Sequence, residues 1–394
     1  MSTAAAIRAY RGPAVFSIGL RPFFLFSALW SAIAAPLWVY AFLNGGPVGL
    51  GWHVHEMLFG YAGGIIVGFL LTAVPNWTGR LPVVGLPLAL LFSLWLAGRA
   101  AMLAVALNAD VAAAAWPAAI DSLFLFIMAA VVWREVLAGR NWRNLPVAMM
   151  VTVLAFANAG FHLEAGAGGV ANLSTRLGLS VVSLMIALIG GRVTPSFTRN
   201  WQLKRGGPLP AVTGRFDTMT LIVTAAGLLA WSFAPAYPTA GMILLAAGVL
   251  NLIRLARWRG EATLAEPLVA ILHLGYLWLT AGLVLLGLAA VAPAQVPPSV
   301  GVHALTAGAI GVMTLAIMTR SSRGHTGRPL TAGTADVLIY GLINAAALTR
   351  VAGGLIPVAY HPLLITSVGL WSAAFLAFVI SYAPILLTPR LGRG

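Results

Sequence analysis

Apolar runs of about 20 residues, the length of a helix that spans a hydrocarbon core, recur along this 394-residue chain. Short polar gaps separate them, and none is long enough to form a soluble domain. We therefore predict an all-α, polytopic membrane protein with a single integral membrane domain over residues 1–394. Twelve transmembrane helices are expected, at roughly 20–43, 52–75, 84–107, 113–134, 145–163, 173–194, 214–235, 238–256, 267–290, 300–319, 332–353 and 361–387.

Composition supports this class and narrows the possible chemistry. Only 8% of the residues are charged, against about a quarter in an average soluble domain. The chain has no cysteine. Disulfides, iron–sulfur clusters and thiolate metal sites are therefore excluded, and a metal would need histidine, methionine or oxygen ligands.

The positive charges predict the orientation. Nearly all of the 23 Lys and Arg residues lie in the termini or in connections that follow even-numbered helices. By the positive-inside rule, both termini should be cytoplasmic, in a bacterial inner membrane. Anionic lipid then accounts for the net charge of +14, and no nucleic-acid partner is expected.

Helices 2 and 10 share a pattern that suggests an internal repeat. The same number of residues separates His55 from Arg80 and His303 from Arg328, and each arginine ends a Thr-Gly-Arg motif. A unit of four helices used three times fits this spacing, with repeats at 14–144, 145–260 and 261–394. Chance similarity of two short motifs is the alternative. Membrane proteins built from repeats commonly place their working site where the repeats meet.

Most of the seven histidines should lie near the external ends of their helices. A single interfacial histidine usually contacts headgroups, whereas several in one leaflet indicate a metal or haem site. His53 and His55 point to opposite sides of helix 2, since a helix turns by about 100° per residue. The external histidines are His53, His55, His162, His303 and His361, while His273 lies inside helix 9 and His325 in a cytoplasmic loop.

The acidic residues argue mildly against a proton-coupled transporter, which would use carboxylates within the membrane. There are nine, and the sequence does not predict paired carboxylates within the membrane. Four of them lie near predicted helix ends, where capping or solvation by the interface is the expected role. These four are Asp110, Asp121, Asp217 and Asp336.

Three arginines, Arg99, Arg176 and Arg350, lie at or inside predicted helices. An arginine within a membrane costs about 2.5–3.5 kcal/mol on insertion scales. Each therefore either extends to the far interface or balances a buried anion, for instance a haem propionate. Gly60 and Gly64 form a stripe of small residues on helix 2 that either packs against another helix or leaves room for a flat macrocycle.

Five sequence blocks together resemble the NnrS family of haem- and copper-containing membrane proteins linked to nitric oxide and denitrification. The blocks are Arg21–Phe24, Trp52–Met57, Leu71–Arg80, His273–Trp278 and Gly324–Leu330. The resemblance implies bound haem, of b-type, and copper, with nitric oxide as partner and a role in nitrosative-stress resistance. It implies no named reaction, although an enzyme of this kind would be a haem–copper oxidoreductase acting on nitric oxide. A cofactor-free secondary transporter or channel is the alternative.

The matched motifs lead to a hypothesis for the haem. We expect His55 and His303 to be its axial ligands, with Gly60 and Gly64 beside the ring and Arg99, Arg176 or Arg350 near the propionates. His273 is the alternative haem ligand. The architecture would then parallel haem–copper oxidases, which use three arcs of four helices.

A second metal site is expected near His53 and His162, with Glu56 as a supporting partner and copper as the ion. His273 is again an alternative ligand. The turn that contains His325 and Arg328 is either a headgroup anchor or a polar latch between helices 10 and 11, matched by Arg80 after helix 2.

Overall fold

The structure is a computed structural model that describes residues 10–80, 82–167 and 171–392. Within these ranges the secondary structure is helical, without strands, and twelve helices are long and apolar enough to cross a membrane. This confirms the predicted fold class. The spans are Leu20–Asn44, Leu50–Thr78, Leu86–Leu107, Trp116–Ala138, Trp142–Gly166, Asn172–Leu203, Arg215–Phe233, Pro238–Ala256, Pro267–Val291, Pro298–His325, Thr334–Leu355 and Pro357–Leu387.

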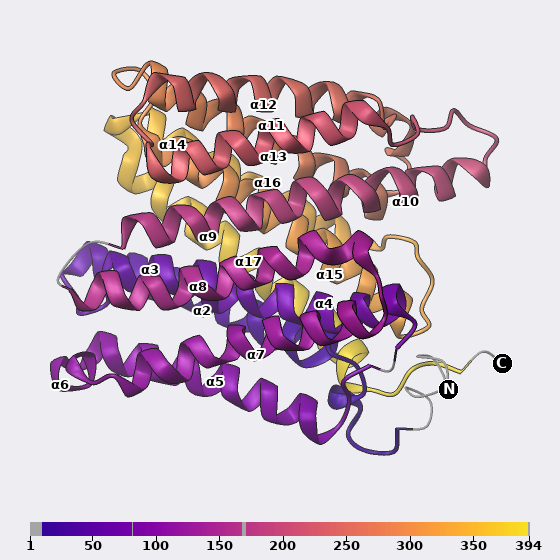
Figure 1. Ribbon diagram of the computed structural model, residues 1–394, viewed down its shortest axis with the longest axis horizontal. Helices are drawn as coiled ribbons and strands as arrows, with labels where there is room; N and C mark the ends of the chain where they lie inside the picture. Colours follow the sequence, from indigo (N-terminus) through magenta and orange to yellow (C-terminus); the bar gives the residue numbers. More distant parts are fainter. Residues whose placement is uncertain (1–9, 81, 168–170, 393–394) are drawn as a thin grey trace. The chain divides into compact units, whose positions relative to one another are not determined.

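The chain divides into two compact units. Unit 1 contains residues 1–181, 321–328 and 379–394, and unit 2 contains residues 182–320 and 329–378. In unit 1, α2 (Leu20–Asn44) packs against α4 (Gly63–Thr78). The helices α5 (Leu86–Leu107), α7 (Trp116–Ala138) and α8 (Leu145–Gly166) follow one another side by side (Figure 1).

Unit 2 is built around α13 (Pro267–Val291), which packs against α12 (Pro238–Ala256). Helix α11 (Arg215–Phe233) also packs against α12 (Figure 1). Glycines allow the close approach of α12 and α13. A Cβ atom on Gly241 would lie 2.8 Å from the Gly287 carbonyl oxygen, and the converse distance is the same. Small residues let membrane helices pack backbone to backbone in this way.

Three of the spans are interrupted by a wider, π-helical segment. In the second span, α3 (Leu50–His55) leads into a π segment at Glu56–Ala62 and then into α4. In the tenth span, α14 (Pro298–His303) leads into a π segment at Ala304–Ile310 and then into α15 (Gly311–His325). The sixth span contains a shorter π segment between α9 (Asn172–Met185) and α10 (Gly191–Leu203).

The second and tenth spans therefore share their local geometry as well as their motifs. In each, six α-helical residues end at the motif histidine, and seven π-helical residues follow. The glycine of each Thr-Gly-Arg motif then adopts a left-handed conformation, with φ of 70° at Gly79 and 80° at Gly327. A four-helix repeat predicts this match, although the division into three repeats stays a prediction.

Candidate metal centre

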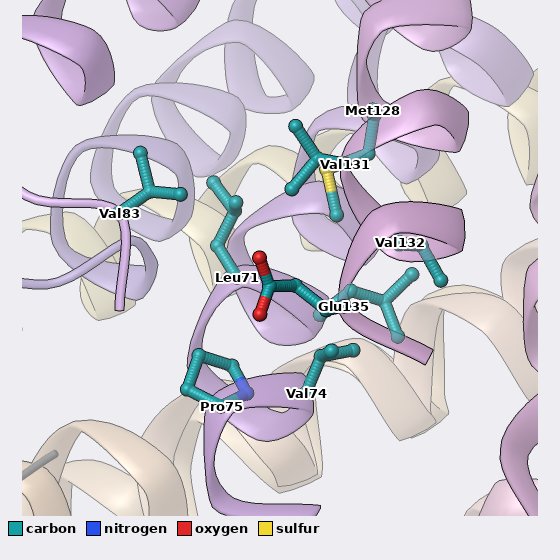
Figure 2. Close-up of a pocket in the computed structure, with 9 residues that line it drawn as sticks. Leu71, Val74, Pro75, Val83, Met128, Val131, Val132 and Glu135 are labelled. Atoms are coloured by element: carbon teal, nitrogen blue, oxygen red, sulfur yellow. The ribbon is translucent and has the colours of Figure 1, made fainter. Parts of the chain in front are cut away.

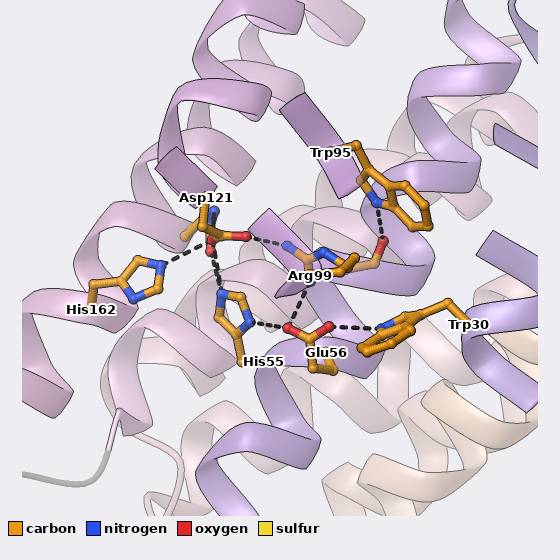
Figure 3. A network of polar contacts seen from close by, with 9 residues as sticks. Trp30, His55, Glu56, Trp95, Arg99, Asp121 and His162 are labelled. Carbon is orange, nitrogen blue, oxygen red and sulfur yellow. Dashed lines mark hydrogen bonds and ion pairs between the residues drawn. The ribbon is translucent and has the colours of Figure 1, made fainter. Parts of the chain in front are cut away.

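His55 stands at the junction between α3 and the π segment, and it is completely buried. A π segment widens the helix and changes which face its side chains present, and such segments occur frequently at functional sites. Both ring nitrogens of His55 have partners. Nδ1 lies 2.9 Å from Oε1 of Glu56, and Nε2 lies 3.0 Å from both Oδ2 of Asp121 and Oδ1 of Asn158 (Figure 3).

Asp121 is the centre of this network, although it lies within the apolar helix α7. Its Oδ2 accepts a hydrogen bond from Asn158 Nδ2 at 2.8 Å and lies 2.9 Å from His162 Nε2. Asn158 and His162 are four residues apart on α8, so they share one face of that helix. Because α8 packs directly against α7, this face meets Asp121.

Three possible metal-ligand atoms lie within 4.8 Å of one another, and they come from His55, Asp121 and His162. His55 and Asp121 are buried, and the His162 side chain is 12% exposed. Two imidazoles and a carboxylate are a donor set that suits divalent transition metals. We call these three residues the His–Asp–His cluster.

Arg99, on α5, neutralises much of the negative charge around the cluster. Its Nη1 donates to Glu56 Oε1 at 2.7 Å, and its Nη2 donates to Asp121 Oδ1. Glu56 also accepts a hydrogen bond at 2.7 Å from the indole of Trp30 (Figure 3). Gly60 makes room for the guanidinium, since a Cβ atom there would lie 2.1 Å from Arg99 Nη1.

The charges of the network do not cancel. With neutral imidazoles, the carboxylates of Glu56 and Asp121 carry two negative charges against the single positive charge of Arg99. Burying a net charge is costly unless it is compensated. One additional positive charge, on a bound metal or as a proton on a histidine, would balance the site.

These contacts correct two expectations. Asp121 does not cap a helix, because its carboxylate is buried among side chains from three other helices. Glu56 and Asp121 also form the pair of membrane carboxylates that the sequence did not predict, because Arg99 holds them together. The capping role does apply to Asp217 and Asp336, whose carboxylates accept hydrogen bonds from the backbone of Gly214 and Gly333.

Of the expected copper ligands, His162 belongs to the cluster and His53 does not. The His53 ring stacks on Trp38, with 4.1 Å between ring centroids. Glu56 supports His55 rather than His53, since its carboxylate contacts His55 Nδ1. The reason is that helix 2 turns His55, not His53, toward α7 and α8.

The glycine stripe packs against side chains. A Cβ atom on Gly64 would lie 2.3 Å from the Ser27 hydroxyl, as Gly60 lies against Arg99. Gly308 packs in the same way against the ring of Trp278. Close helix packing thus explains these glycines, whereas the macrocycle hypothesis required open space beside them.

The two other histidines proposed for haem lie in unit 2. His303 Nδ1 is 2.7 Å from the Ser299 carbonyl oxygen, so this nitrogen carries a proton and donates to the carbonyl. His273 is buried in α13, and its Nε2 lies 2.8 Å from the Thr198 hydroxyl.

Two of the helical arginines do not belong to the cluster either. Arg176 is partly exposed on α9. The Arg350 guanidinium lies 5.7 Å from the centre of the Tyr360 ring. Arg99, by contrast, balances buried anions, as one of the two expectations had it, but these anions are the carboxylates of Glu56 and Asp121 rather than a haem propionate.

Arg80 of the first Thr-Gly-Arg motif forms an ion pair with Glu135, with 2.6 Å between Nε and Oε2. Glu135 is buried, and it lines a small apolar pocket between α4 and α7 (Figure 2). The pocket is otherwise lined by Leu70, Leu71, Val74, Pro75, Val83, Met128, Val131 and Val132. The motif therefore anchors the end of α4 to the end of α7.

The network around the cluster includes residues that sequence reasoning did not assign to a site. Asp121 and Asn158 are polar residues within predicted spans, and Asn158 shares a helix face with His162. Polar residues inside a membrane generally mark functional positions, so this signal was available. What the sequence lacked was evidence that helices 2, 3, 4 and 5 turn these particular faces toward one another.

The profile of the NnrS family, described as NnrS protein, matches residues 14–390. The chain belongs to the NnrS family. A search of curated proteins finds no match. The matched range includes the three residues of the His–Asp–His cluster and the twelve helices that are long and apolar enough to cross a membrane in the described chain.

Proposed function

We propose that this multi-pass membrane protein acts in the response to nitric oxide and holds copper at the His–Asp–His cluster. The convergence of His55, Asp121 and His162 in a buried site carries this proposal. Membership of the NnrS family supports the link to nitric oxide and the choice of copper among the metals that accept such ligands.

The surroundings of the cluster fit a metal ion. A metal-binding histidine usually donates its second ring nitrogen to a carboxylate, which orients the ring and makes it a better ligand. Glu56 stands in that position at Nδ1 of His55, while Nε2 faces Asp121. The uncompensated negative charge of the site also favours a cation.

Copper, if bound, would supply redox chemistry at this site. The protein residues would hold the ion in place. Glu56 orients His55, and Trp30 and Arg99 in turn fix the Glu56 carboxylate. Arg99 also holds Asp121, so one guanidinium sets the position of two carboxylates around the site.

We do not place the haem at the His–Asp–His cluster. Side chains fill the space beside Gly60 and Gly64, where the ring of a haem at His55 would lie. The described residues of unit 1 therefore do not fit a haem at His55. His303 is the better proposal for a haem ligand, because its Nδ1–H donates to a backbone carbonyl, an arrangement typical of metal-ligating histidines.

A cofactor-free, proton-coupled transporter is the second candidate. The observation in its favour is the buried group of Glu56, Asp121 and Arg99, because transporters use such charges in proton relays. In that case the proton on a histidine, rather than a metal, would balance the charge of the cluster.

Metal analysis of the purified full-length protein separates these functions. We expect about one copper per chain assigned to the cluster, lost in His55→Ala and kept in His361→Ala, a matched change at an exposed histidine of α17 (Tyr360–Leu387). An absorption spectrum tests haem independently through its Soret band. Protein that binds no copper after reconstitution with the ion would refute the proposed centre and favour the transporter.

We further propose a bacterial inner membrane with both termini cytoplasmic. The partition of basic residues between alternate connections supports this orientation.

A further inference from the structure

A second group of charged side chains lies in unit 1, at the turn that follows α15 and at the end of α17. We call Arg21, Arg328 and Arg390 the basic cluster. Leu391 N donates to the Thr326 carbonyl at 3.1 Å, so the end of the described chain lies along the second Thr-Gly-Arg turn. Arg390 lies against that turn, with its Nε 3.6 Å from where a Cβ atom of Gly327 would be.

Arg21 is almost completely buried, with 2% of its surface exposed. Its Nη1 donates to the backbone carbonyls of Leu386 at 2.8 Å and Thr388 at 2.6 Å. These carbonyls are neutral and leave the charge uncompensated. The buried Nε of Arg21 has no hydrogen-bond partner among the described residues.

Arg328 brings a second guanidinium close to the first. Its Nη1 is also buried, and it has no partner within the described ranges. The positive charges of Arg21 and Arg328 lie close enough to repel each other. Two buried donors thus accompany two like charges, an arrangement that costs free energy unless an anion occupies the site.

The protein itself provides no counter-charge here. Among the residues that the structure describes, no ion pair joins a carboxylate to any member of the basic cluster. The buried acids of unit 1 bind other arginines, since Glu56 and Asp121 pair with Arg99, and Glu135 pairs with Arg80.

We propose that Arg21 and Arg328 bind a phosphate group, with Arg390 adding to the attraction. A guanidinium presents several N–H donors in a plane and matches the oxygens of phosphate. Arg21 is the second residue of the first span, and Arg328 follows the end of the tenth span by three residues. Both therefore lie at helix ends, the depth at which lipid headgroups meet water. The phosphate of an anionic lipid is the expected source, and free phosphate is the other.

Lipid binding to the full-length protein tests this site. The wild type is titrated with phosphatidylglycerol, phosphatidylcholine or inorganic phosphate, and native mass spectrometry counts the bound molecules. Arg328→Gln should weaken phosphatidylglycerol binding about tenfold, as expected for the loss of one charged hydrogen bond. Arg11→Gln removes the same charge from an exposed position of unit 1 and should bind like the wild type.

A second variant keeps the test decisive if Arg328→Gln does not fold. Arg328→Lys retains the charge but not the planar donor group, and it should give a smaller loss than Gln. If the wild type binds inorganic phosphate but not phosphatidylglycerol, and the Arg328 variants lose this binding, the site is supported with free phosphate as its ligand. Equal binding of phosphatidylglycerol by the wild type, both Arg328 variants and Arg11→Gln would overturn the proposal.

Discussion

Asp121→Asn is the most informative single change in this protein. The substitution preserves the size of the side chain but removes its charge and one of its acceptor oxygens. Asp121 contacts His55, His162, Asn158 and Arg99, so all four lose a favourable interaction. The formal charge of the cluster changes from minus one to zero, which removes its attraction for a cation.

The cost in stability follows from the Arg99 ion pair. Removing one partner of a buried salt bridge costs about 3–5 kcal/mol, because the other charge stays buried. Arg99 keeps its bond to Glu56 in the variant, so we expect a loss near the lower limit, about 3 kcal/mol. Copper should be lost almost completely, since a ligand and the net negative charge disappear together.

Asp217→Asn is the matched control. Asp217 is a buried aspartate of unit 2 whose Oδ1 accepts a hydrogen bond from Arg254 Nε at 2.8 Å. Arg254 keeps its bonds to the Ala187 carbonyl and the Tyr276 hydroxyl in this variant. The two substitutions should therefore lower stability by similar amounts, while only Asp121→Asn releases copper.

The assay combines two measurements on protein in detergent. Tryptophan fluorescence on heating reports the apparent unfolding midpoint, and elemental analysis reports copper per chain. If Asp121→Asn keeps its copper, the cluster is not the metal site. If Asp217→Asn loses as much copper as Asp121→Asn, the loss reflects general destabilisation, and the reasoning about the cluster fails.

Three further outcomes are expected. His162→Ala should release copper, whereas His53→Ala should retain it because that ring stacks on Trp38; elemental analysis that ranks them the other way would restore His53 as a ligand. Gly79→Ala should cost about 1 kcal/mol through its left-handed backbone alone, whereas Gly327→Ala should cost more, since its Cβ would also lie 2.9 Å from a carbonyl oxygen; equal shifts on heating would contradict this. A reporter fused at Gly45 should read as periplasmic, and a cytoplasmic signal would reject the proposed orientation.

The amino-acid sequence determined the class of protein and its helical layout. Apolar runs long enough to cross a membrane can form only helices or closed barrels there, because every backbone polar group must be satisfied within the structure. The spacing within helices 2 and 10 also predicted two equivalent positions, and both His55 and His303 stand immediately before a π segment. These are local properties, which depend on residues close together in the chain.

Which residues form the candidate metal centre depended on tertiary structure. Its residues come from separate helices, and the sequence does not say which face of each helix turns inward. In a soluble helix the polar face identifies the outside, but in a membrane both the lipid-facing and the buried faces are apolar. Asp121 therefore looked like a residue near a helix end until α5, α7 and α8 brought Arg99, Asn158 and His162 around it.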